Sequence, residues 1–160
     1  METRSDVEGG QRHGAPVGPR LTVTSDTDVH SELEGALVAS NEFQVGAVGS
    51  DVQLCLRTPE GGLVAGISGA TWGETAWIHV LWVEPELRLR GHGAALLAAF
   101  ENHAREVGCL QVLVSTYSFQ ALPFYERRGY VALSRIADVP AAGSDLIHLA
   151  KRWDGRPRGG

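Results

Sequence analysis

The chain has 160 residues, of which 43% are hydrophobic and 21% charged, with a formal net charge of −5. This length suits one domain with a proper core, and the acidic balance argues against non-specific nucleic-acid binding while weakly favouring a cationic substrate. No signal peptide is visible and no apolar run approaches the length of a membrane span, so we expect a cytoplasmic protein without a membrane partner.

The only cysteines, Cys55 and Cys109, are far apart in the sequence. They have no metal-type spacing and are typical of reduced packing residues in a cytosolic protein. We therefore expect neither a disulfide framework nor a metal site.

The start of the chain is irregular and polar. Residues 1–19 are rich in Gly and Arg and predict a disordered tail before one domain over 20–153. Within it, residues 20–25 alternate as a first strand. The next predicted helix is capped by Ser25 or Thr27, reaches about Ser40 and turns Leu33, Ala36, Leu37 and Val38 to the core. Residues 41–50 predict a loop.

Three strands should follow as an antiparallel meander. Their predicted ranges are Val52–Arg57, Leu63–Trp72 and Thr75–Val83, separated by glycine-bearing turns. Gly66 and Gly69 inside the second strand indicate a bulge or a close backbone approach.

A helix follows the third strand and ends near Val107. Leu96, Leu97, Phe100, Ala104 and Val107 share one face, while Glu101, Asn102, Arg105 and Glu106 share the other.

The rest of the chain predicts a strand, a helix and two more strands. The strand Leu110–Thr116 is reached by a helical crossover and should run parallel to the strand ending at Val83. A helix runs from about Ser118 to Arg128, although Pro123 favours a later start. Strands over 129–137 and 145–153 precede a short polar tail, 154–160. The pattern predicts an α/β fold with a mixed, mostly antiparallel sheet of about seven strands flanked by helices.

The segment Arg88-Leu-Arg-Gly-His-Gly93 joins the third strand to the helix. Glycines let the backbone approach a ligand, and the first amides of a helix form an anion site suited to phosphate or pyrophosphate. A plain turn with two solvated arginines is the alternative. No Gly-Lys-Ser/Thr is present, and the strand Leu110–Thr116 ends in Ser-Thr rather than an acid, which disfavours both a triphosphate loop and a nicotinamide cofactor.

Two blocks together resemble the GNAT superfamily of N-acetyltransferases. The first is Arg88-x-x-Gly91-x-Gly93 after a strand, and the second is Ser118-Phe-Gln-Ala-Leu-Pro-Phe124-Tyr125-Glu-Arg-Arg-Gly129-Tyr130. The likeness covers about residues 20–153. It implies one parallel strand pair that splays at a site for acetyl-CoA, the co-substrate.

The resemblance also implies how the co-substrate is held. The pyrophosphate would take the backbone amides of the loop, and the pantetheine arm would pair with an open strand edge. The implied cofactor-binding residues are Leu81, Trp82, Val83, Arg88, Leu89, Arg90, Gly91, His92, Gly93, Ala94, Ser118 and Phe124. Ser118 stands where the family more often has asparagine, and a helix cap is its other interpretation.

Three residues are candidates for moving protons. The resemblance places Tyr125 beside the sulfur as the acid, with a packed core tyrosine as the alternative. His79 is the candidate base, on a face shared with Trp77, Leu81 and Val83, unless it is a buried structural histidine. Glu84 is the second candidate base, or simply a solvated side chain.

Two functions remain open from the sequence. One is transfer of an acetyl group from acetyl-CoA to a primary amine of a small molecule or peptide by direct attack in a ternary complex. The other is a non-catalytic acyl-CoA-binding sensor module of the same fold. The last strands are a candidate surface for a homodimer.

Overall fold

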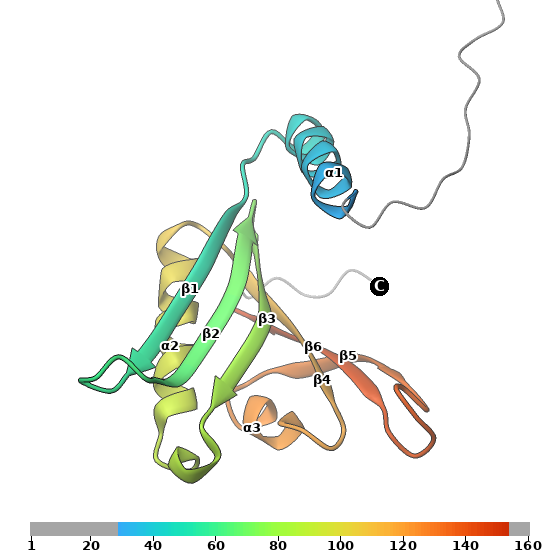
Figure 1. The fold of residues 1–160 in the computed structure, drawn as a ribbon. Coiled ribbons are helices and arrows are strands. Elements are labelled where there is room, and N and C mark those ends of the chain that lie inside the picture. Colours follow the sequence, from blue (N-terminus) through green and yellow to red (C-terminus); the bar gives the residue numbers. More distant parts are fainter. Residues whose placement is uncertain (1–28, 154–160) are drawn as a thin grey trace, which may run out of the picture. The chain divides into compact units, whose positions relative to one another are not determined.

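The computed structural model of this chain describes residues 29–153, drawn in Figure 1. By their contacts the residues form two compact units, divided in the chain between Leu37 and Val38. The sheet described below belongs to the second unit. Several sequence predictions lie outside the described residues: the tail 1–19, the strand 20–25, the caps Ser25 and Thr27, and the tail 154–160.

Six strands form one mixed sheet in the order β1-β2-β3-β4-β6-β5. Neighbouring strands are antiparallel except β3 and β4, which run parallel. The bounds are β1 Ser50–Arg57, β2 Leu63–Trp72, β3 Thr75–Val83, β4 Gln111–Tyr117, β5 Val131–Ile136 and β6 Leu146–Arg152. The predicted α/β class, the meander and the single parallel pair are confirmed; the further predicted strand is the one at 20–25.

Helix α2 (His92–Glu106) connects β3 to β4 and covers one face of the sheet, as Figure 1 shows. Its apolar stripe fills the core: Leu96, Leu97, Phe100 and Ala104 are all buried. Val107 was predicted on the same face but is 51% exposed, because the helix ends at Glu106 and Val107 is only its C-cap.

Glu101 was predicted on the helix face opposite the apolar stripe, yet its side chain is only 5% exposed. Its carboxylate accepts hydrogen bonds from the Tyr130 hydroxyl at 3.1 Å and from Lys151 Nζ at 2.6 Å. An Arg105 guanidinium nitrogen lies 3.5 Å away. Burial and the neighbouring carboxylate raise the pKa of Tyr130. The buried charge is tolerated because it is paired and hydrogen-bonded, and it joins α2 to β6.

A β-bulge changes the faces of β3. The β2–β3 register shifts at Ser68/Gly69, where Ser68 pairs with Val80 and Gly69 with Ile78, so His79 is the extra residue. A Cβ on Gly69 would lie 2.0 Å from the Trp77 carbonyl oxygen, which explains why glycine stands there. The predicted close approach at Gly69 is confirmed.

The bulge contradicts the prediction that Trp77, His79, Leu81 and Val83 share one face. Ala76 and Ile78 are buried before it, and Leu81 and Val83 pack against the same core after it. His79 and Val80 are both exposed. A strict period of two fails wherever one strand carries an additional residue.

Helix α1 (His30–Val45) is longer than predicted and has no buried residue. Residues 41–45, predicted as loop, continue the helix. The predicted core positions are all exposed: Leu33, Ala36, Leu37 and Val38. Within the second unit, Gly49 N–H donates to Glu42 Oε1 at 2.8 Å and Trp72 Nε1–H donates to the Ala47 carbonyl at 2.9 Å.

Helix α3 (Leu122–Glu126) is short and begins after Ser118, with Ala121 as its N-cap. Ser118 is therefore not a helix cap. Pro123 is accommodated because it lies in the first turn, where its missing N–H costs no helical bond.

The cysteines are both free, and only Cys109 is buried; Cys55 is exposed, so it is not a packing residue. Within residues 29–153, no group of three or more His, Cys, Asp or Glu is placed to hold a metal ion. No helix in that same stretch is both long and apolar enough to cross a membrane.

Candidate active site

The parallel strands β3 and β4 separate part-way along their length. They pair from Thr75↔Gln111 to Ile78↔Val114, and then β3 continues to Val83 without β4 beside it. This is the splay that the resemblance implied. It leaves backbone groups of β3 without ladder partners at an edge in the middle of the sheet.

The open edge of β3 presents particular donors. Glu84 N–H donates to the Val64 carbonyl on β2 at 2.9 Å. Because N–H groups alternate sides along an extended strand, those of Val83 and Leu81 point away from β2, towards the open edge. Trp82 N–H points back to β2, so among the three predicted contacts Leu81 and Val83 are the ones that offer amides.

The loop after β3 holds a second set of free donors, which we call the amide cradle: the N–H groups of Leu89 to Ala94. The first helical bond of α2 is Ala95 N–H to the Gly91 carbonyl, and no side chain caps the helix. Within the described part of the chain the cradle amides have no hydrogen-bond partner. They lie at the positive end of the helix dipole.

Backbone conformation shapes this cradle. Gly91, the N-cap, has φ 89°, and Leu89 has φ 61°, a left-handed conformation that a leucine rarely adopts. Such a conformation costs about 1–2 kcal/mol for a non-glycine residue. Strain held at an exposed loop is a common mark of a functional segment.

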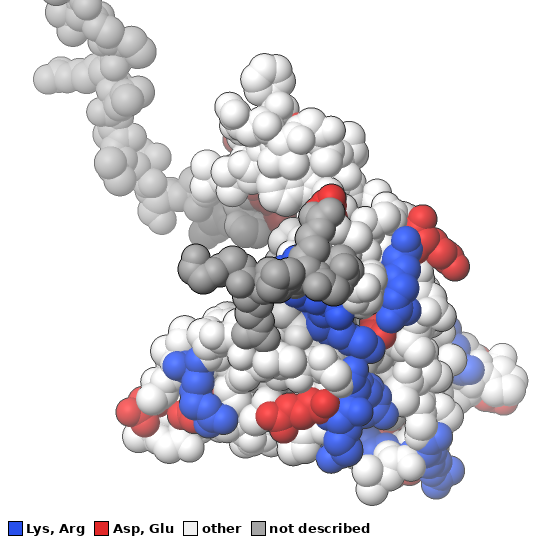
Figure 2. Space-filling model, turned by 180° about the vertical axis from the view of Figure 1, so that it is seen from behind, with Lys and Arg blue, Asp and Glu red and all other residues white. Residues whose placement is uncertain are grey.

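The cradle and the strand edge adjoin each other. Arg88 Nε donates to the Val83 carbonyl at 3.1 Å. The Cβ position of Gly93 lies 3.5 Å from Val83 Cγ2 and 3.7 Å from the Phe124 ring. Figure 2, a view from behind, shows Lys and Arg side chains on that side of the molecule with Asp and Glu side chains among them. One set of free amides thus lies on the strand edge and a second at a helix N-terminus close to it, which suits a ligand with an amide-bearing arm and a phosphate end.

Tyr125 follows Phe124 on α3 and packs in the core. It is 4% exposed, and its ring meets those of Phe124 and Tyr130 edge-on. Burial raises the pKa of its phenol to about 12. The side chain therefore stays protonated at neutral pH and can donate a proton or a hydrogen bond.

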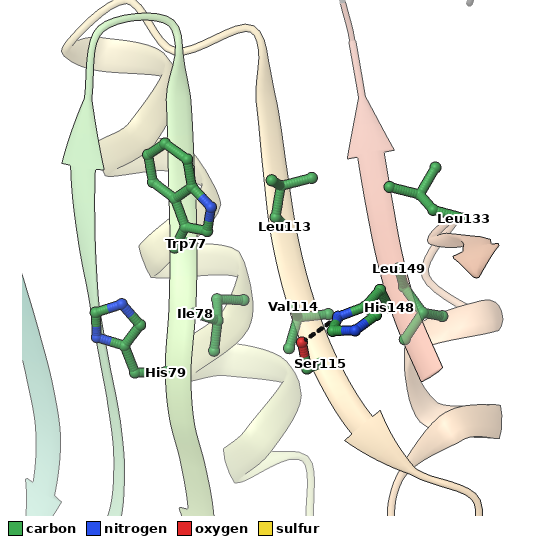
Figure 3. Close-up of a pocket in the computed structure, with 9 residues that line it drawn as sticks. All are labelled: Trp77, Ile78, His79, Leu113, Val114, Ser115, Leu133, His148 and Leu149. Atoms are coloured by element: carbon green, nitrogen blue, oxygen red, sulfur yellow. Dashed lines mark hydrogen bonds between the residues drawn. The ribbon is translucent and has the colours of Figure 1, made fainter. Parts of the chain in front are cut away.

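A hollow of about 540 Å³ opens at the splay, on the face of the sheet away from α2 (Figure 3). Its polar side chains are His79, Ser115 and His148, and its apolar wall includes Trp77. The remaining lining residues are Ile78, Leu113, Val114, Leu133 and Leu149. Of the two predicted bases, the structure brings His79 to this hollow and leaves Glu84 outside its lining. The side chain of Glu86 raises the pKa of the Glu84 carboxyl.

Ser115 and His148 were not among the predicted site residues. They are direct partners in the β4–β6 ladder, and Ser115 Oγ lies 2.7 Å from His148 Nδ1. Each is a polar residue between buried residues of its strand. Many solvated strand positions show the same pattern, so the sequence carried no signal of a site. Their pairing across 33 positions became visible only with the sheet order.

The chain is similar to known proteins of one family. Residues 30–130 match the Acetyltransferase (GNAT) family. The chain belongs to the GNAT family. An acetyltransferase of Agrobacterium fabrum is 26% identical over 134 residues, covering 83% of this chain and 97% of that protein. The blasticidin-S acetyltransferase of Streptomyces morookaense is 41% identical over 83 residues, covering 50% of this chain and 60% of that protein.

Solved structures agree with the family. The crystal structure of an acetyltransferase from Bacillus cereus has a TM-score of 0.70 at 26% identity, covering 83% of this chain and 98% of that one. The GNAT protein described here is thus an acetyl-CoA-dependent N-acetyltransferase. The amide cradle and the open edge fit acetyl-CoA by their chemistry, since free N–H donors suit both a pyrophosphate and a chain of amides.

Ser118 is the predicted cofactor residue whose hydroxyl already has a structural partner in this GNAT fold. Its oxygen accepts a hydrogen bond from Asp145 N–H at 3.0 Å, and its own N–H donates to the Asp145 carbonyl at 2.8 Å. The hydroxyl proton remains available for a ligand, because a serine oxygen can accept and donate together.

Proposed function

We propose that this protein transfers the acetyl group of acetyl-CoA to a primary amine by direct attack in a ternary complex, and that the acceptor is a small molecule or a peptide amine. The observation that carries the proposal is the presence of two neighbouring sets of free backbone donors, Leu81 and Val83 on the strand edge and Leu89–Ala94 in the cradle. The thioester arm of acetyl-CoA would bind the strand edge, and its phosphates would bind the cradle.

The cradle is proposed to bind the pyrophosphate, with Arg88 and Arg90 adding positive charge. Amides of Leu81 and Val83 would pair with the pantetheine arm. One of them would donate to the thioester carbonyl as negative charge develops on its oxygen. His92 and Gly93 would contribute chiefly through their backbone, and Phe124 through the wall of the groove.

Tyr125 is proposed to help the sulfur leave. A phenol with pKa of about 12 keeps its proton until the thiolate forms, and it then donates a hydrogen bond or the proton itself. The amine enters from the hollow on the opposite face of the sheet, so that the two substrates meet at the splay. His79 and Glu84 are the groups that sequence reasoning suggests for the amine proton.

The acceptor remains to be identified by assay. One relative is named for blasticidin S, which makes that compound the first probe. Aminoglycosides, polyamines, amino acids and a peptide with a free N-terminus complete a panel. The residues lining the hollow include no carboxylate among those the structure describes, which gives no direct support for a polycation.

Thiol release from acetyl-CoA, followed with a thiol-reactive dye for each amine, tests the proposal. We expect release that depends on one class of amine and an acetylated product with the corresponding mass increase. If acetyl-CoA binds but no amine in the panel accelerates release, the proposal of amine acetylation is contradicted.

A further inference from the structure

The strand ladder places two polar residues opposite each other at the mouth of the splay. Ile78↔Val114 is the last β3–β4 pair, so His79 and Ser115 are the first residues past it on their strands. Ser115 is paired across the next ladder with His148. Figure 3 shows His79 on one side of the hollow and the Ser115–His148 pair on the other.

Resting on the proposed acetylation of an amine, we propose that His148 is the general base that takes the amine proton, and that Ser115 is the residue that positions it. The pair lies next to the point where β4 leaves β3, which is where a thioester lying along the open edge meets the hollow. His148 lies outside the two sequence blocks, 88–93 and 118–130, that resemble the GNAT superfamily.

The two histidines differ in how they are held. His148 has its Nδ1 fixed at 2.7 Å from Ser115 Oγ, and the side chain is half-buried. The exposed His79 is the extra residue of the bulge, and within the described chain its ring has no hydrogen-bond partner. In Figure 3 its imidazole leans towards β2, away from β4. A base must be held in hydrogen-bond reach of the proton it removes, and this favours the fixed ring.

Ser115 suits a base that changes protonation state. In the proposed tautomer, His148 Nδ1–H donates to Ser115 Oγ and the lone pair of Nε2 is free. When Nε2 gains a proton, Nδ1–H keeps donating to the same oxygen. The hydrogen bond is thus satisfied before and after proton transfer, and it keeps the ring in one orientation.

His148 and Tyr125 together account for the protons that move in the proposed reaction. The neutral amine attacks the thioester carbon, a C–N bond forms, and one N–H proton passes to His148 Nε2. The C–S bond breaks with its electron pair on sulfur, and Tyr125 supplies a proton there. His148 and Tyr125 then return to their starting forms by exchange with solvent. No oxidant or metal is consumed.

The titratable and charged groups near His148 lie on several elements. His79 is the titratable group across the hollow from His148. On β4, Tyr117 lies two residues after Ser115. Beside β6, Arg135 of β5 forms an ion pair with Asp145. The lining of the hollow, as far as the structure describes it, has no Asp, Glu, Lys or Arg. Because a histidine must be neutral to accept the amine proton, the rate profile is expected to have an acidic limb.

The kinetic test compares His148→Gln, His79→Gln and a matched His103→Gln on α2, behind the opposite face of the sheet. With acetyl-CoA and blasticidin S, or whichever panel amine the wild type accepts, we expect His148→Gln to lose about 100-fold or more in kcat. It should also lose the acidic limb and keep the KM for acetyl-CoA. His79→Gln should lose less, and His103→Gln should match the wild type. Equal loss in the first two variants, or a larger loss in His79→Gln, overturns the assignment.

A second measurement needs no acceptor. ¹⁵N-resolved NMR of the histidine side chains reports which ring nitrogen carries the proton in the neutral form. We expect Nδ1–H for His148, retained in Ser115→Thr and lost as a fixed preference in Ser115→Ala. An Nε2–H tautomer in the wild type contradicts the proposal. If the wild type acetylates no amine, the proposed function fails; if it does and His148→Gln is unimpaired, only this inference fails.

Discussion

Replacing Gly69 with alanine should disrupt the bulge that sets the two faces of β3. The new Cβ would lie 2.0 Å from the Trp77 carbonyl oxygen and 2.9 Å from Phe100 Cζ. The oxygen belongs to the backbone, and Phe100 is completely buried, so neither can move aside without cost. The strands must instead separate by more than an ångström at the bulge.

The size of this effect follows from two contributions. Overpacking a closed core costs about 1–3 kcal/mol, and weakening the ladder bonds beside the bulge adds roughly 1 kcal/mol for each bond lost. With about two such bonds lost, we expect Gly69→Ala to lower the free energy of unfolding by about 3–5 kcal/mol. That is a large part of the 5–15 kcal/mol typical of a domain.

Gly66→Ala is the matched control because Gly66 lies on the same strand three residues earlier. Its Cβ would approach the Leu54 carbonyl oxygen only to 3.5 Å, which is ordinary contact. Alanine there should be neutral or stabilise by up to about 1 kcal/mol through the unfolded chain. Urea unfolding of both variants, followed by tryptophan fluorescence, measures the difference. Equal stabilities would refute the account of the bulge.

Three further predictions concern the cradle, the acid and the buried charge. Gly91→Ala and Gly108→Ala both place alanine at positive φ with open space around it, at opposite ends of α2. Each should lower the free energy of unfolding by about 1–2 kcal/mol. Only Gly91→Ala should weaken acetyl-CoA binding, as measured by calorimetry. Tyr125→Phe should bind acetyl-CoA normally and lose kcat. Burial raises the pKa of Tyr125 to about 12, above its value of ~10 in the unfolded chain. The free energy of unfolding of the wild type should therefore fall by about 2–3 kcal/mol relative to that of Tyr125→Phe as the pH rises from 10 to 12, with no difference arising below pH 9. Glu101→Gln should destabilise by about 2–4 kcal/mol in urea unfolding, whereas Glu106→Gln, exposed on the same helix, should change stability by less than about 0.5 kcal/mol.

Much of the sheet could be predicted because its signals are local. The alternation of β2 and β3 and the glycine turns between them gave their bounds, 63–72 and 75–83, as the structure has them. The parallel partner of β3 followed from the helical crossover. The cradle was predicted in the same way, since a strand, a glycine loop and a helix are contiguous in the sequence.

The errors share a physical cause, which is dependence on distant residues. The burial of Glu101 could not be predicted because its partner Lys151 lies 50 residues away. The face of β3 beyond His79 was wrong because the bulge depends on how Gly69 packs against Phe100. Helical periodicity in α1 suggested a buried side that the structure does not bury. For the same reason, His79 was predicted as a candidate base, whereas Ser115 and His148 were not predicted as site residues.

Titration of acetyl-CoA into ¹⁵N-labelled wild-type protein tests most directly whether the amides of Leu81, Val83 and Leu89–Ala94 bind it. The largest amide shifts should fall on Leu89–Ala94, with Leu81 and Val83 shifting more than Trp82, whose N–H points to β2. Saturable binding that leaves these amides unmoved, or no binding at all, would contradict the account.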